Sequence, residues 1–194
     1  DARRLNVYLP PGYDWGSDAY PVLYMPDGGV LEDFPHVATT VDSLIRLGRI
    51  RPVLVVGVEN TMRRRDMTGP TAVASDSAIA PVVGGSAAFR AFFREELMPE
   101  LRRRFRVTDE AGIVGESLAG LFVVETFLLE PALFRHYIAL SPSLWWNGGA
   151  LVQASGPRVA ALGPAPRTIY LSSADEANIV PAAAALADTL RQRA

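Results

Sequence analysis

The sequence predicts a three-layer α/β fold, a mostly parallel sheet with helices on both faces, and three observations support this. Short apolar segments alternate with segments whose apolar residues recur at helical spacing, the pattern of successive β-α-β units. The segment 52–58 is a continuous apolar run, typical of a parallel strand buried on both faces. The chain has 194 residues, 49% of them hydrophobic, and shows no repeat or linker, so we expect residues 1–194 to form one domain.

Six segments have the composition and boundaries of strands. The first, 5–9, alternates apolar and polar residues and is followed by Pro10-Pro11-Gly12, which ends it. The second, 20–25, is broken by the glycines that follow Asp27. The other four are short apolar runs between turn residues and helical segments. We therefore expect strands at residues 5–9, 20–25, 52–58, 111–114, 136–140 and 168–171.

Helices are predicted between these strands from periodicity and end signals. Gly48 suits the C-terminal cap of the first helix. Ser86 is a candidate N-cap for a helix with a phenylalanine and leucine stripe, which Pro99 is expected to kink or end. The helix before Pro131 is apolar nearly all round, as a central enclosed helix should be. We expect helices at residues 37–47, 86–101, 121–129 and 179–190, and a long surface excursion at 60–85.

The composition argues against several classes of function. A net charge of −2, with acidic residues flanking the arginine clusters 63–65 and 102–104, does not suit a nucleic-acid binder. The chain has no cysteine, and its two histidines are too far apart for a ligand motif, so we expect no metal and no other cofactor. No run of about eighteen apolar residues predicts a membrane span.

The cellular compartment and the oligomeric state stay open at this stage. The chain begins at Asp1 without a charged and apolar leader, which fits either a removed signal peptide or a trimmed chain. Both the bacterial cytoplasm and export therefore remain alternatives.

The segment Gly115-Glu116-Ser117-Leu118-Ala119-Gly120 lies between a predicted strand and a predicted helix. A serine on such a tight turn is exposed, so that a base and hydrogen-bond donors can converge on its hydroxyl. The small residues Gly115 and Ala119 are needed because larger side chains two positions away would collide as the chain reverses. The sequence thus predicts a nucleophile elbow with Ser117 as the nucleophile, and the α/β-hydrolase fold that carries such elbows.

Acyl transfer through a serine also needs donors for the oxyanion of the tetrahedral intermediate. The backbone N–H of Leu118 follows the nucleophile at a helix N-terminus, where negative charge is favoured. A second donor should come from the loop after an early strand, and Asp27-Gly28-Gly29 is such a loop. We expect the N–H of Gly29 to be this donor, against the alternative of a plain glycine turn.

The acid and the base of the triad are expected after the nucleophile, in the order serine, acid, histidine. Asp175 and Glu176 follow the last predicted strand, and one of them, with Asp175 favoured, should orient the base. Neither His36 nor His136 fits this order. We therefore expect the chain to lack its C-terminal strand and the loop with the catalytic histidine, with His36 as the alternative base.

Three further residues are candidates for substrate contact. Trp145 and Trp146 follow a strand end, where ligands of open α/β sheets collect, although at least one of them should belong to the core. Arg65, in the long excursion, has the chemistry to clamp an anionic group, and a surface ion-pair cluster is the other interpretation.

Several of these motifs together resemble the putative esterase family, which includes esterase D, S-formylglutathione hydrolases, siderophore esterases and feruloyl esterases. The resemblance implies metal-free hydrolysis of a small-molecule ester through an acyl-serine at Ser117. An acyltransferase on the same site and a catalytically inactive binding domain are the alternatives. Ala119 in place of a second glycine and the missing histidine depart from the family pattern. The resemblance rests on Leu9-Pro10-Pro11-Gly12-Tyr13, Asp27-Gly28, 52–58, Arg64-Arg65-Asp66, the elbow, and Ser141-Pro142-Ser143-Leu144-Trp145-Trp146, which is similar to the siderophore-esterase branch.

Overall fold

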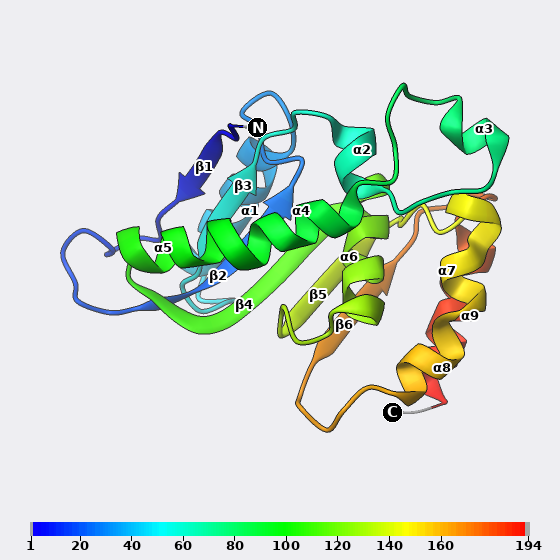
Figure 1. Ribbon diagram of the computed structural model, residues 1–194. Helices are drawn as coiled ribbons and strands as arrows, with labels where there is room; N and C mark the ends of the chain where they lie inside the picture. The colour runs from blue at the N-terminus through cyan, green and yellow to red at the C-terminus, as the bar shows by residue number, and fades with distance from the viewer. Residues whose placement is uncertain (1, 193–194) are drawn as a thin grey trace.

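The computed structural model describes residues 2–192, and it contains one six-stranded sheet (Figure 1). The strand order is β1-β3-β2-β4-β5-β6, in which β1 runs antiparallel to β3 and all other neighbours are parallel. The predicted strands are all present, with β4 longer than expected. The strands are β1 (Leu5–Tyr8), β2 (Tyr20–Pro26), β3 (Leu54–Val58), β4 (Val107–Glu116), β5 (His136–Leu140) and β6 (Thr168–Ser172).

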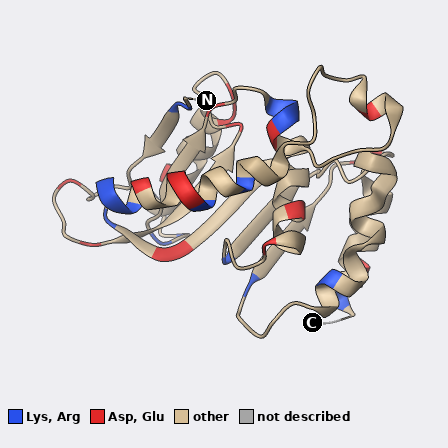
Figure 2. Ribbon diagram, in the orientation of Figure 1, with Lys and Arg blue, Asp and Glu red and all other residues tan. Residues whose placement is uncertain are grey.

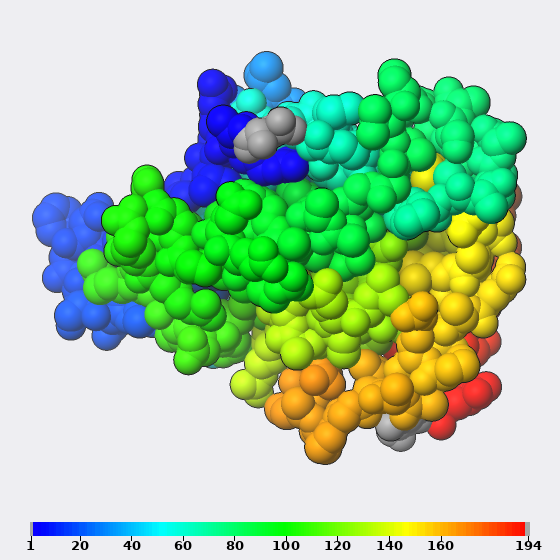
Figure 3. All heavy atoms as spheres, in the orientation of Figure 1, coloured from blue at the N-terminus to red at the C-terminus, as the bar shows by residue number. Residues whose placement is uncertain are grey.

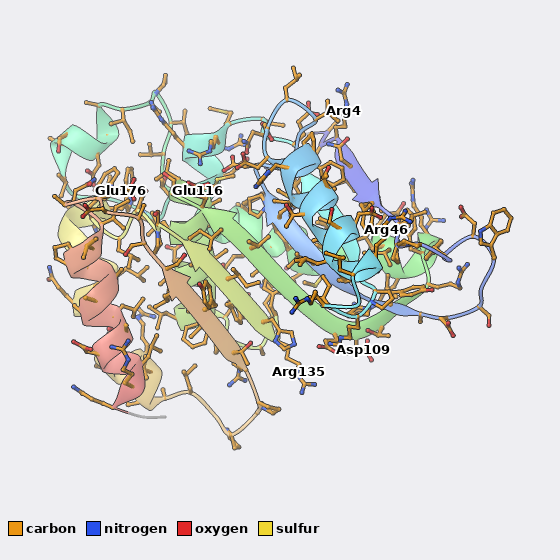
Figure 4. All side chains as sticks on the ribbon, turned by 180° about the vertical axis from the view of Figure 1, so that it is seen from behind. Arg4, Arg46, Asp109, Glu116, Arg135 and Glu176 are labelled. Atoms are coloured by element: carbon orange, nitrogen blue, oxygen red, sulfur yellow. The ribbon has the colours of Figure 1, made fainter. Side chains whose placement is uncertain are left out.

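Helices cover both faces of the sheet. Helix α1 lies on one face, and α4, α5, α6 and α8 lie on the other, while α9 packs against α8 and β6 (Figures 1 and 4). The helices are α1 (Phe34–Arg46), α2 (Arg63–Met67), α3 (Ala74–Ser77), α4 (Ser86–Phe92), α5 (Met98–Arg104), α6 (Leu118–Leu129), α7 (Ala150–Gln153), α8 (Ser155–Ala160) and α9 (Val180–Arg191). This is the three-layer arrangement that the alternation of segments predicts.

The core is divided by the sheet, as the run at 52–58 predicts. In β3 the side chains of Leu54 and Val56 join the larger cluster under α4 and α6, whereas Val55 joins the smaller cluster with Val41 of α1. All five residues of β3 are buried. Helix α6 is buried along almost its entire length, which explains why its sequence is apolar all round.

The helix with the phenylalanine stripe is irregular near Pro99, where a kink or an end is expected. It does not end there but continues to Arg104 (Figure 1), and a π-helical segment, Phe93–Leu97, is separated from the proline by Met98 alone. Proline offers no N–H to the preceding turn, so an irregular hydrogen-bond pattern forms there in place of a helix end. The predicted cap at Ser86 is wrong: Gly85 holds the N-cap position, and within residues 2–192 the buried Ser86 hydroxyl has no hydrogen-bond partner.

The parallel strands bring their carboxyl ends to one edge of the sheet. Figure 4 shows Glu116, at the end of β4, and Glu176, after β6, at this edge, while Asp109 and Arg135 lie at the opposite edge. The elbow and the acidic segment therefore share one edge, with β5 between their strands.

Charged residues of both signs are interspersed along the helices (Figure 2). In α5, Arg103 and Arg104 both bond the carboxylate of Glu100, so this arginine cluster is largely an intrahelical ion-pair network. Within residues 2–192, no helix is both long enough and apolar enough to span a bilayer.

Candidate active site

Ser117 joins β4 to α6 in a strained backbone conformation. Its φ is 57° and its ψ is −117°, a region that residues with a side chain rarely adopt. The Ser117 N–H donates to the carbonyl of Leu140 on β5 at 3.0 Å, and its own carbonyl accepts the N–H of Leu121 at 2.9 Å. The turn is thus fixed by the neighbouring strand on one side and by the first hydrogen bond of α6 on the other.

The small residues around the serine are sterically required, as predicted. A Cβ on Gly115 would lie 2.6 to 2.8 Å from the carbonyl carbon, carbonyl oxygen and Cβ of Ala119. A Cβ on Gly120 would lie 3.0 Å from both the Leu140 carbonyl oxygen and the Cα of Pro142. Ala119 is completely buried, so the elbow accepts a methyl group there but has no room for a larger side chain.

A second hydroxyl stands beside the nucleophile. The Oγ of Ser143 lies 3.3 Å from the Oγ of Ser117, and the Ser143 N–H donates to the Ser117 carbonyl at 3.0 Å. Sequence reasoning did not assign a role to Ser143. The signal available in the sequence was its place three residues after β5, the strand that pairs with β4.

The predicted oxyanion loop is packed tightly against β3. A Cβ on Gly28 would overlap the backbone of Gly57, and the Gly28 N–H donates to the Val58 carbonyl at 2.9 Å. The N–H of Gly29, the expected second donor, is bonded to the Glu32 carboxylate at 2.6 Å. The structure therefore gives this donor an internal partner, which an ester carbonyl would have to displace.

The loop is also held through the side chain of Asp27, whose φ is 56°. Arg63 donates from Nε and Nη2 to the two Asp27 oxygens at 2.6 and 2.8 Å, and Asn60 donates to Oδ1 at 2.5 Å. The hydrogen bond to Asp27 raises the pKa of Arg63. The sequence analysis missed this pair, because its partners are separated by the whole of α1 and β3.

Arg65, in α2, is engaged in ion pairing. Its Nε lies 2.7 Å from Asp66, which also receives Arg3 at 2.8 Å. Burial raises the pKa of Asp66, but the hydrogen bonds from Arg65 and Arg3 outweigh it, so the pKa lies below its ordinary value. The ion-pair interpretation of this cluster is the one that the geometry favours, and a substrate clamp at Arg65 stays a prediction.

Asp175 and Glu176 follow β6 and are exposed at the edge that carries the elbow. The Ala174 N–H donates to the Ser141 hydroxyl at 3.1 Å, which ties this segment to the loop after β5. The Glu176 carbonyl accepts the N–H groups of Ile179 and Val180 at the start of α9. Both carboxylates therefore lie at the edge that carries the elbow, and a triad acid at Asp175 or Glu176 stays a prediction.

The two histidines lie in different parts of the molecule. His136 begins β5, at the edge opposite the elbow, and its ring nitrogens contact Thr168 and Glu110 at 2.8 Å each. His36, in the first turn of α1, lines a cavity of about 270 Å³ together with Glu116 and Leu140. Glu116, the residue before the nucleophile, is exposed there. Neither histidine hydrogen-bonds Ser117 within the described part of the chain.

One tryptophan of the pair belongs to the core, as expected, and this corrects the assignment of both to the substrate. Trp146 is 4% exposed, and its indole N–H donates to the Gly69 carbonyl at 2.9 Å. Trp145 is 36% exposed and remains a candidate for substrate contact. Asn147, which follows Trp146, takes a left-handed conformation, and its N–H donates to the Asp76 carboxylate at 2.7 Å.

The hydrogen bonds that Asn147 makes with Ala72 and Asp76 fasten the 60–85 excursion to the loop after β5. In the space-filling view the excursion lies against the segment near residue 150 (Figure 3). Among residues 2–192 no group of three histidine, cysteine, aspartate or glutamate side chains is arranged to hold a metal ion.

Taken together, the sheet order and the strained serine between β4 and α6 define an α/β-hydrolase fold with a nucleophile elbow. Residues 1–180 match the sequence profile of the family described as "Putative esterase", and the chain belongs to this family.

Relatives of known name are similar to parts of the chain. Ferri-bacillibactin esterase BesA of Bacillus subtilis is 34% identical over 148 residues, which make up 66% of this chain and 49% of BesA. The siderophore triacetylfusarinine C esterase of Aspergillus fumigatus is 38% identical over 90 residues, 44% of this chain and 29% of that protein. The chain therefore spans about half the length of BesA and less of the fungal relative.

The fold recurs in solved structures. The BES protein from Bacillus cereus superposes with a TM-score of 0.84 at 22% identity, covering 98% of this chain and 78% of that one. At this identity the similarity establishes the fold.

Proposed function

We propose that this chain carries the nucleophile of a serine esterase that hydrolyses carboxylic esters through an acyl-serine. The observation that carries the proposal is the conformation of Ser117. A non-glycine residue with φ 57° and ψ −117° between a strand and a helix costs about 1–3 kcal/mol and persists only where the surroundings enforce it. Here it presents a hydroxyl group beside the N-terminus of a buried helix, where nucleophilic catalysis needs it.

In the proposed reaction the Ser117 oxygen attacks the ester carbonyl carbon as a base removes its proton. The oxyanion that forms is stabilised by the Leu118 N–H, because the first N–H groups of a helix have no partner within the helix. The Gly29 N–H becomes a second donor if the Glu32 carboxylate is displaced. Collapse of the intermediate releases the alcohol, which takes the proton from the base. Water then attacks the acyl-serine through the same two steps, which releases the acid and restores Ser117.

The base is proposed to be a histidine that follows the acidic segment, oriented by Asp175 or Glu176. The order serine, acid, histidine supports this position. The two histidines of these 194 residues precede the acids, and His136 lies at the wrong edge of the sheet. His36 is the competing base, because it shares a cavity with Glu116 of the elbow.

The proposed substrates are ester-linked siderophores. The names of the relatives support this class, since they include a ferri-bacillibactin esterase and a triacetylfusarinine C esterase. The exposed indole of Trp145, next to the loop that touches the nucleophile, offers an aromatic surface for such a ligand.

The nucleophile is tested by Ser117→Ala in the complete gene product. Hydrolysis of ferri-bacillibactin, triacetylfusarinine C and p-nitrophenyl acetate should fall by at least about a thousandfold, while the thermal midpoint stays near that of the wild type. Ser155→Ala is the matched control, because the hydroxyl of this buried serine donates to the Val152 carbonyl in α7, and this variant should keep full activity. A Ser117→Ala variant with more than a few per cent of wild-type activity would refute the assignment. Added alcohol as an acceptor tests for acyl transfer, and an inactive wild type would favour a binding domain.

The base is tested by comparing the 194-residue chain with the complete gene product, each with and without His36→Ala. We expect at least about a thousandfold more activity in the complete product than in the 194 residues, the scale of losing one triad member. Activity of the short form that disappears with His36→Ala would show instead that His36 is the base.

A further inference from the structure

Ser143 is a polar side chain in contact with the proposed nucleophile, and it has no role in the chemistry described so far. Its hydroxyl is 3.3 Å from the Ser117 hydroxyl, and in the described part of the chain each of these groups has the other as its hydrogen-bond partner. Ser143 is 2% exposed, so bulk water does not compete readily for its hydroxyl. Buried hydroxyl groups are normally hydrogen-bonded, and the Ser117 oxygen lies within reach of this one.

The position of this hydroxyl is fixed from both sides. The Ser143 N–H bonds the Ser117 carbonyl, and the Ser143 carbonyl accepts the Trp146 N–H at 3.2 Å. Leu144 is completely buried, and the indole of Trp146 is anchored on Gly69. The loop therefore cannot withdraw the hydroxyl from the nucleophile without breaking core packing.

We propose that Ser143 is a further catalytic residue, whose hydroxyl donates a hydrogen bond to the Ser117 oxygen as the bond between that oxygen and the acyl carbon forms or breaks. This inference rests on the proposed esterase function. No proton is transferred from Ser143: the base takes the Ser117 proton and returns it, and Ser143 only stabilises the partial negative charge on the oxygen. An interaction of this kind is stronger in the transition state than in the resting enzyme.

The resting distance agrees with this role. At 3.3 Å the two oxygens are farther apart than in a typical O–H···O bond of about 2.7–2.8 Å. Catalytic hydrogen bonds are often long in the unliganded enzyme and shorten as charge develops. The Ser143 hydroxyl can rotate toward the growing charge without a backbone movement, because its backbone is already bonded to the nucleophile's own residue.

The test uses Ser143→Ala and Ser143→Cys in the complete gene product, with Ser155→Ala as the control. Alanine removes the donor but keeps the backbone bonds, and cysteine keeps most of the volume while offering only a weak donor. We expect kcat and kcat/KM for p-nitrophenyl acetate to fall together by about 10- to 100-fold in both variants, with KM unchanged within about twofold. The rate of covalent labelling by a fluorophosphonate, which also forms a bond to the Ser117 oxygen, should fall in parallel.

Each other outcome has a defined meaning. Wild-type rates in a folded Ser143→Ala variant, a rise in KM alone, or an equal loss in Ser155→Ala would overturn the catalytic role. Failure of both Ser143 variants to fold would assign the residue to packing and overturn it as well. If the wild type neither hydrolyses esters nor reacts with the fluorophosphonate, the proposed function fails first and this inference fails with it.

Discussion

Replacement of Gly115 by alanine is the most direct test of the elbow. The added Cβ would lie 2.6 Å from the Ala119 carbonyl carbon and 2.7 Å from its oxygen, whereas non-bonded carbon atoms prefer about 3.5–4.0 Å. About 1 Å of separation must therefore be created between the end of β4 and the first turn of α6. The atoms in the way belong to the backbone and to a buried methyl group, so no side-chain rotation relieves the contact.

The cost follows from two opposing effects. Overpacking of this kind typically costs about 1–3 kcal/mol, and a backbone obstacle favours the upper end. Replacing glycine lowers the conformational entropy of the unfolded chain, which stabilises the folded protein by about 0.4–1 kcal/mol. We expect a net loss of about 2 kcal/mol, which lowers the thermal midpoint of a chain of this size by about 4–8 °C. A displacement of about 1 Å at the nucleophile should also lower kcat/KM by about 100-fold.

The assay is thermal unfolding followed by circular dichroism, together with ester hydrolysis at 25 °C. Gly156→Ala is the matched control, because this glycine lies in α8, and apart from its chain neighbours and its own helix backbone no described atom lies within 4 Å of the position of a Cβ. The control should melt at or slightly above the wild-type temperature. A Gly115→Ala variant that melts like the wild type and keeps its activity would refute the steric account of the elbow.

Three further predictions follow from the contacts around the site. Arg63→Leu removes the ion-pair partner of the buried Asp27 carboxylate and should lower the free energy of unfolding, measured in urea, by about 1–3 kcal/mol. The loss should be smaller than for a fully buried pair because the arginine is partly exposed, and an unchanged urea midpoint would contradict this. Since the folded-state pKa of Asp66 is lowered, its ion pairs stabilise the protein above the ordinary value of 3.8 and are lost as the pH falls through the lowered value. Asp66→Asn should therefore lose less stability between pH 7 and pH 3 than the wild type, and equal losses would refute the shift. Trp146→Phe leaves a buried carbonyl unpaired and should cost about 1–3 kcal/mol in urea unfolding, whereas Trp145→Ala should mainly raise KM; the reverse pattern would exchange their roles.

The sequence by itself determined the layered fold and the position of the nucleophile, because both are written in local patterns. The apolar run of β3 requires burial on both faces, and the small residues around Ser117 are needed within a single turn. The strand before the acidic segment was predicted for the same reason, because its apolar run and the residues that end it are local features. Such features depend on residues a few positions apart, so periodicity and turn chemistry suffice to predict them.

The side-chain partners around the nucleophile were decided only by the tertiary structure. Ser143 reaches Ser117 across 26 positions because β5 pairs with β4, and Arg63 reaches Asp27 across 36 positions because β3 pairs with β2. Tertiary packing also buried Trp146 and left Trp145 exposed. These contacts depend on which strands become neighbours and how far each loop extends beyond the sheet, and no local pattern of residues records either quantity.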